Sequence, residues 1–178
     1  TANPEIDDFD SNDNRFRARV VTVGAGKLNL DSAVRSTVAA DPATVSLGIV
    51  RATGGLPSAG LMLSNFGSSS VTLALSVVQD DADSRARVTL SNTSVTLAAG
   101  ASSLITVRLD GTTPSPGQYQ GTIRITGGPV ALRVPYLYAV GDNVPYNAFP
   151  LRGNLFTKTP DSEIRGINFK AVDRYGVP

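Results

Sequence analysis

Apolar and polar residues alternate in short runs across the middle of this chain, between Pro42 and Asp142. Gly, Ser, Pro and Asp residues separate these runs, as turn residues separate strands. The runs are Val45–Val50, Gly60–Ser64, Val71–Val78, Ala86–Leu90, Ser94–Leu97, Ser103–Leu109, Gln118–Thr126 and Ala131–Val140. A period of two places successive side chains on opposite faces of a strand. The pattern therefore predicts an all-β fold: an Ig-like or fibronectin-like antiparallel β-sandwich of about seven strands.

The same alternation predicts which side chains face the core. The inward residues of four runs are Val71, Leu73, Leu75 and Val77; Ile105, Val107 and Leu109; Ile123 and Ile125; and Leu132, Val134, Tyr136 and Tyr138. Burial of these side chains is enough to stabilise a domain without a disulfide. Pro135 interrupts the last run, and because proline cannot donate to a β-ladder, we expect this strand at an edge of its sheet.

The segments on either side of the sandwich have other patterns. Thr1–Asn14 is polar and acidic, which predicts a loop, and Phe16–Val23 predicts a short extended piece. Asp31–Val38 is predicted to be the one helix of the chain, short and near the N-terminus. Gly166–Asp173 predicts a strand followed by a turn, with no partner strand in its own segment.

Two features of the predicted helix can be checked against a structure. Asn29 or Asp31 is placed to cap its N-terminus. Its apolar face comprises Leu30, Val34 and Val38, which follow a helical period.

Composition removes most catalytic chemistry from this chain. Its 178 residues include no histidine, cysteine or tryptophan. A Ser-His-Asp or Cys-His site needs an imidazole, and zinc is normally held by His and Cys, so none of these sites can be built from this chain alone. The formal net charge is +1 with no basic block, so we expect no nucleic-acid partner. The apolar runs are far shorter than the ~20 residues of a membrane helix, so we expect no membrane insertion.

One acidic stretch offers oxygen ligands at alternate positions, Asp8, Asp10 and Asn12. Calcium prefers several such ligands at close range. An EF-hand loop beginning at Asp8 would need Gly at its sixth position and Glu at its twelfth, where this chain has Asp13 and Arg19. We therefore prefer a solvated acidic loop, with these three residues as weak calcium candidates, and expect no cofactor and no catalytic residue.

A second acidic cluster, Asp80, Asp81 and Asp83, lies between two predicted strands. These side chains could hold a cation, but Arg85 and Arg87 are close enough to neutralise them. We interpret the cluster as a charged turn.

Tyrosines supply two further hypotheses. Tyr119 follows a Pro-Gly turn, and a Tyr near this corner of a Greek-key sandwich often donates a hydrogen bond back to the chain. Tyr136 and Tyr138, with Tyr146 and Phe149, could form an aromatic platform for a sugar. Interdomain packing is the more ordinary interpretation of these four rings.

Several short phrases, in a fixed order along the chain, resemble one known family. The phrases are TAN at 1–3, GAGKLNLDSAV at 24–34, ATVSLG at 43–48, PGQYQGTIRI at 116–125, LRVPYLYAVGD at 132–142 and FKAVDRYGVP at 169–178. The first two resemble the end of the catalytic domain of bacterial subtilisin-like serine proteases. The next three resemble the fibronectin-like sandwich attached to many secreted members, and the last resembles the start of a further Ig-like domain.

This resemblance implies a division of the chain and a function. Residues 1–41 would be the tail of an upstream catalytic domain, 42–142 the sandwich, and 143–178 a linker and the truncated start of a following Ig-like domain. None of Asp7, Asp31 and Ser32 matches a catalytic motif of the family. The region would be a non-catalytic accessory of a secreted or cell-surface bacterial endopeptidase, with the protease domain and neighbouring Ig-like domains as its partners.

Two other functions stay open. A carbohydrate- or protein-binding module of the adhesion type would use exposed aromatic side chains as contacts. An independent hydrolase with two carboxylates is the enzyme class that the composition still allows.

Overall fold

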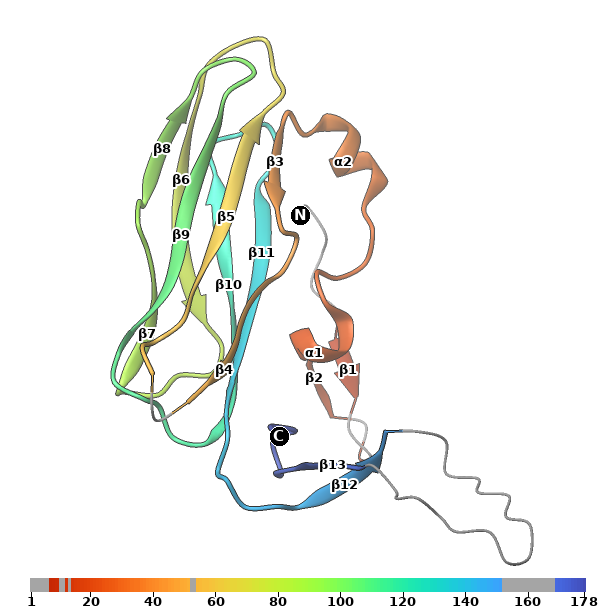
Figure 1. Ribbon diagram of the computed structural model, residues 1–178. Coiled ribbons are helices and arrows are strands. Elements are labelled where there is room, and N and C mark those ends of the chain that lie inside the picture. The colour runs from red at the N-terminus through yellow and green to blue at the C-terminus, as the bar shows by residue number, and fades with distance from the viewer. Residues whose placement is uncertain (1–6, 10–11, 13, 52–53, 152–168) are drawn as a thin grey trace, which may run out of the picture.

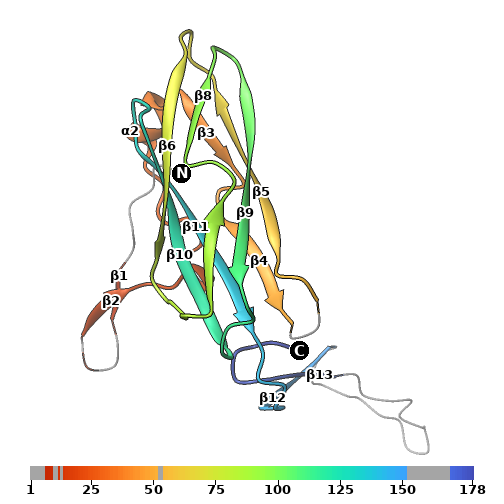
Figure 2. The same ribbon diagram turned by 90° about the vertical axis from the view of Figure 1, so that its left-hand side faces the viewer.

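The computed structural model describes residues 7–9, 12, 14–51, 54–151 and 169–178, and two β-sheets packed face to face form its main body (Figures 1 and 2). The five-stranded sheet comprises, in spatial order, β4 (Val45–Val50), β11 (Leu132–Val140), β10 (Gly117–Thr126), β6 (Val71–Gln79) and β8 (Ser94–Leu97). The four-stranded sheet comprises β3 (Val38–Asp41), β5 (Ser58–Asn65), β9 (Ser102–Gly111) and β7 (Ala86–Leu90).

The predicted all-β sandwich is confirmed, and each of the predicted runs is a strand. The described part of the chain has five and four strands in the two sheets, more than the predicted seven. One addition is β3, at Val38–Asp41, which pairs with β5. Neighbouring strands are antiparallel except β4 and β11, which are parallel.

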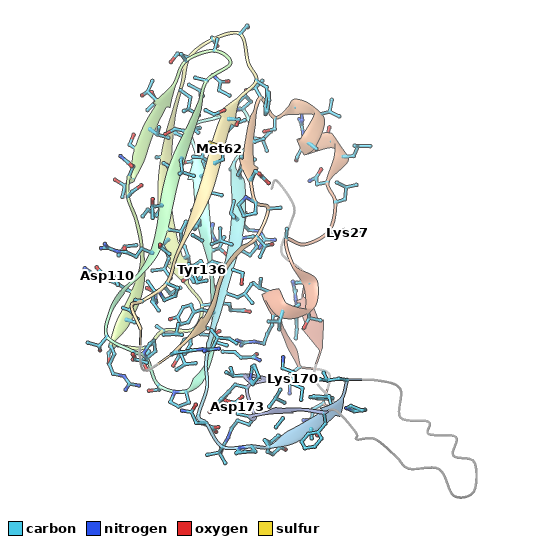
Figure 3. All side chains as sticks on the ribbon, in the orientation of Figure 1. Lys27, Met62, Asp110, Tyr136, Lys170 and Asp173 are labelled. Carbon is cyan, nitrogen blue, oxygen red and sulfur yellow. The ribbon has the colours of Figure 1, made fainter. Side chains whose placement is uncertain are left out.

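The core lies between the two sheets and contains the side chains that the alternation predicted. Ile105, Val107, Ile123 and Val134 have no exposed surface, and Figure 3 shows Tyr136 between the sheets. Burying one such aliphatic side chain contributes about 1.5–3 kcal/mol. The hydrophobic effect therefore holds the two sheets together.

The prediction that Pro135 marks an edge strand is wrong, because β11 lies between β4 and β10. The pairing nevertheless explains why proline is tolerated. Pro135 lies opposite Thr122 of β10, whereas the ladder with β4 begins only at Tyr136. Among the described strands, none forms a second ladder with β11 at the position of the proline, so the missing N–H interrupts none.

The N-terminal segment differs from its prediction in two places. The expected loop includes β1 (Asp7–Phe9), which pairs with β2 (Arg15–Arg17). The expected extended piece instead turns into α1 (Val20–Val23). The side chain of Val20 is buried, and its N–H donates to Oε1 of Gln120, 2.8 Å away. This contact with a residue 100 positions away outweighs the β-preference of a valine-rich run.

The predicted helix is present as α2 (Leu30–Arg35), so the described residues form two short helices rather than one. Asn29 caps it, because its Oδ1 accepts the N–H of Ser32 at 3.0 Å. The helix ends before Val38, which lies in β3 and is buried. Leu30 and Val34 are 68% and 79% exposed, so the predicted apolar face is not covered by the described residues.

The C-terminal strand has a partner, contrary to our expectation. β13 (Phe169–Val172) pairs antiparallel with β12 (Asn147–Pro150), and Asn147 lies opposite Val172. The first residues of the predicted strand, from Gly166, lie outside the described residues. The two-stranded sheet lies beside the lower end of the sandwich in Figure 1.

We expect Ile123→Ala to lower the free energy of unfolding by ~2–5 kcal/mol, because it removes fully buried methyl and methylene groups and leaves a cavity. Val34→Ala is the matched control, since its side chain is exposed, and should change stability by less than ~0.5 kcal/mol. Urea unfolding followed by circular dichroism measures both. Equal losses in the two variants would contradict this assignment of the core.

Candidate functional site

The loop between β6 and β7 meets the turn before β10 at the side chain of Asp83. Its Oδ1 accepts the N–H of Arg85 at 2.9 Å and Nε of the same residue at 3.1 Å. Its Oδ2 accepts the N–H of Ser115 at 3.0 Å. The side chain of Asp83 is 11% exposed. One carboxylate therefore links two loops that are more than 30 residues apart in sequence.

The electrostatics of this cluster favour a permanent ion pair. The Arg85 guanidinium, followed by the N–H groups of Ser115 and Arg85, holds the pKa of Asp83 well below its usual range. The hydrogen bond from Arg85 to Asp83 raises the pKa of the guanidinium in turn. A carboxylate in this state carries no proton at neutral pH, so it is not suited to general acid catalysis. The structure thus supports the prediction that this is a charged turn.

Asp81 has a partner that the sequence analysis did not identify. Nη2 of Arg19, in the N-terminal segment, lies 2.9 Å from Oδ2 of Asp81. No local signal could have found this pair, because the two residues are 62 positions apart and only the fold brings them together.

Tyr119 forms the predicted hydrogen bond back to the chain. Its hydroxyl donates to the carbonyl oxygen of Ser115 at 2.8 Å, and it lies 3.4 Å from Oδ2 of Asp83. Its ring stacks on Tyr138 with a centroid distance of 4.8 Å. Tyr119 therefore connects the Asp83 cluster to the hydrophobic core.

The aromatic platform proposed from the sequence does not exist as one surface. Tyr136 and Tyr138 are 1% and 2% exposed and lie in the core, whereas Tyr146 and Phe149 are 77% and 52% exposed. The strand period explains the burial, because both buried rings follow the inward positions of β11. Burial raises the pKa of Tyr136, and burial also raises the pKa of Tyr138 to about 12. Both phenols are therefore protonated at neutral pH.

A cleft of about 840 Å³ lies beside the Asp83 cluster, between the end of β6 and β7. Residues that line it include Val77, Gln79, Asp83, Arg85, Arg87 and Asp110. Asp83 is bound to Arg85, and Oδ1 of Asp110 is 3.6 Å from Nη2 of Arg108. The carboxylate of Asp83 is thus held in its ion pair with Arg85, and its lowered pKa makes it a weak base.

The calcium hypothesis stays a prediction. Asp10 lies outside the described residues, and Asp8 is described only by its backbone, in β1. Asn12 is in a turn and is exposed. Within the part of the chain that the structure describes, no group of three or more acidic, His or Cys side chains is placed to hold a metal ion. Nor do these residues form a helix long and apolar enough to cross a membrane.

Large apolar side chains are exposed on both segments that flank the sandwich. On the N-terminal side, Leu28, Leu30 and Val34 are 74%, 68% and 79% exposed. On the C-terminal side the exposed residues are Val144, Tyr146, Phe149, Leu151 and Phe169. We call these sets the helix patch and the hairpin patch. Exposed apolar side chains on an ordered segment are available for contact with another protein or domain.

Comparison with known proteins gives only distant likenesses. No family model matches the chain, and no curated protein matches it. A PapD-like domain of human CEP192 is 15% identical, with a TM-score of 0.48, over 60% of this chain and 86% of that domain. The secreted serine protease VesC from Vibrio cholerae is 19% identical, with a TM-score of 0.48, over 72% of this chain and 27% of that protein. A chain of the CsuC–CsuE chaperone–adhesin complex from Acinetobacter baumannii is 11% identical, with a TM-score of 0.49. The match covers 59% of this chain and 52% of that one.

We expect Tyr119→Phe to lower the free energy of unfolding by ~0.5–1.5 kcal/mol, because it removes the hydrogen bond to Ser115. Tyr136→Phe is the matched control. Its hydroxyl is buried and has no hydrogen-bond partner among the described residues, so its removal should leave stability unchanged or slightly higher. Chemical unfolding of both variants tests this. A larger loss for Tyr136→Phe than for Tyr119→Phe would contradict it.

We also expect Asp83 to contribute to acid sensitivity. Because its folded-state pKa is lowered, the ionised carboxylate stabilises the fold above the ordinary pKa of about 4, and this stabilisation is lost as the pH falls below it. The free energy of unfolding of Asp83→Asn should therefore be lower than that of the unaltered protein at pH 7. Between pH 7 and pH 2 it should fall less steeply. Parallel acid slopes in Asp83→Asn and the unaltered protein would refute this role.

Proposed function

We propose that this chain is a non-catalytic accessory β-sandwich region of a secreted bacterial subtilisin-like serine protease. The observation that carries the proposal is the position of the helix patch and the hairpin patch. Both are on segments joined to the sandwich by hydrogen bonds and ion pairs, yet their apolar side chains are exposed. An exposed apolar surface on an ordered segment is suited to burial against a neighbouring domain.

The order of the phrases in the sequence suggests which neighbour covers each patch. The helix patch includes part of GAGKLNLDSAV, which resembles the end of the protease domain, so we place the catalytic domain against Leu28, Leu30 and Val34. The hairpin patch overlaps FKAVDRYGVP, which resembles the start of an Ig-like domain. Complete burial of one leucine contributes about 1.5–3 kcal/mol, so a few such contacts are enough to hold two domains together.

In this proposal the chain performs no bond-breaking step. The catalytic Asp, His and Ser belong to the upstream domain, and this region spaces the domains and shapes the access of large substrates. Its own carboxylates at the cleft are engaged in ion pairs with arginine, as Asp83 with Arg85 illustrates. The same proposal places the protein at the cell surface or among secreted proteins.

A carbohydrate- or protein-binding module is the second candidate, and the exposure of Tyr146 and Phe149 favours it. Two of the four rings first considered for a platform are buried, so any such surface would depend on the hairpin patch alone. Binding of the chain to a glycan array that is lost on Tyr146→Ala would favour this function over domain packing.

We expect Leu30→Ser with Val34→Ser, made in the full-length protease, to lower the melting temperature of the catalytic domain by several degrees. The two substitutions remove apolar contacts at the interface without touching the core of the sandwich. Leu104→Ser is the matched control, because Leu104 is 57% exposed but lies on β9, away from either patch. Calorimetry with and without the upstream domain measures the effect. Identical melting of the catalytic domain in all variants would reject this packing role.

A further inference from the structure

The beginning of β10 contacts both flanking segments of the chain. The carbonyl oxygen of Gln118 accepts a hydrogen bond from Nη2 of Arg19 at 3.0 Å. Nε2 of the same Gln118 donates to the carbonyl oxygen of Tyr175 at 2.9 Å. Arg19 is 99 residues and Tyr175 is 57 residues from Gln118 in sequence. A single residue therefore touches the segment that enters the sandwich and the segment that follows it.

The N-terminal contact is reinforced by buried neighbours. Arg19 also pairs with Asp81 at 2.9 Å, and the N–H of Val20 donates to Oε1 of Gln120. Gln120 is 6% exposed and Val20 is 9% exposed, so this hydrogen bond is shielded from water. Further along, Nη2 of Arg133 in β11 donates to the carbonyl oxygen of Ala25 at 3.1 Å.

The C-terminal contact is organised by the buried carboxylate of Asp173, which is 5% exposed. It accepts the N–H groups of Asp142, Tyr175 and Val177, each at 2.8 Å. Burial opposes ionisation of Asp173, but these hydrogen bonds outweigh it and lower the pKa of the side chain. Nε of Arg174 adds an ion pair with Asp142 at 2.8 Å.

The turn after β13 also packs directly on the backbone at the end of β11. A Cβ added to Gly141 would lie 2.9 Å from Cγ1 of Val177 and 3.1 Å from Oδ2 of Asp173. Only glycine allows this approach without a shift of the turn. Figure 3 shows Asp173 at the lower end of the sandwich, where β11 ends.

We propose that the contacts of Gln118, Arg19 and Asp173 form a fixed-angle joint, so that both flanking segments keep one orientation relative to the sandwich and to each other. β10 is a suitable base, because it is held between β6 and β11 by a ladder on each side. Flexible linkers lack such side-chain contacts and sample many orientations. The helix patch and the hairpin patch are then presented to their neighbours at a set distance and angle. The inference concerns this chain alone and does not depend on which domains lie beside it.

The absence of native cysteine makes the joint directly measurable, because introduced cysteines can be spin-labelled without background. We place labels at Val21→Cys on α1, which follows Arg19 and is 56% exposed at this position, at Thr106→Cys on β9 and at Lys170→Cys on β13, in pairs. Electron–electron double resonance should give one narrow distance distribution for each pair. Broad or multiple distance distributions in the labelled but otherwise unaltered protein would overturn the proposal.

Variants separate the two halves of the joint. Asp173→Ala should remove the narrow peak for the 106–170 pair and leave the 21–106 pair unchanged. Arg19→Ala should broaden the distance distribution of the 21–106 pair alone. Asp110→Ala, which removes a carboxylate of the sandwich outside the joint, should leave both pairs narrow. A melting curve of each variant confirms that the sandwich stays folded. If Asp173→Ala keeps the narrow 106–170 peak, the fixed-angle joint is wrong, whatever the result for domain packing.

Discussion

The burial of alternating side chains between two sheets is the interaction on which the rest of this structure depends. Residues such as Ile105, Val107 and Ile123 lose all contact with water only when the sheets close on each other. That closure also places Tyr138 beneath Tyr119, whose hydroxyl holds the turn at Ser115. The positions of the loops at Asp83 and Ser115 therefore depend on the packing of the core as well as on local sequence preference.

Two carboxylates, those of Asp83 and Asp173, accept hydrogen bonds from several backbone N–H groups. Asp83 joins two loops at one end of the sandwich, and Asp173 closes the turn that lies against the end of β11. Both side chains are largely shielded from water, and the pKa of each is lowered by the hydrogen bonds it accepts. A buried charge is tolerated only when it is well satisfied, so these two residues contribute order to the loops rather than reactivity.

The flanking segments are fixed to the sandwich, yet their apolar side chains are exposed. Arg19 and Asp173 attach these segments to the sandwich, while Leu30 and Phe149 remain exposed. A free apolar side chain on a mobile tail would lose much entropy on binding, whereas one on a fixed segment is already positioned. The arrangement is thus suited to a spacer that packs between domains, which is the function we propose.

The sequence by itself determined the sandwich, its inward residues, a short helix capped by Asn29 or Asp31, and the Tyr119 hydrogen bond, because each depends on local periodicity or on a short spacing. Only the tertiary structure decided that Pro135 lies in an interior strand, that Val20 is helical, and that Tyr146 is exposed, apart from the buried Tyr136. These outcomes depend on the strand neighbours and on contacts such as that between Val20 and Gln120, whose partners are distant in sequence. Local pattern fixes which face of a strand is apolar, but the packing of the whole chain decides what covers that face.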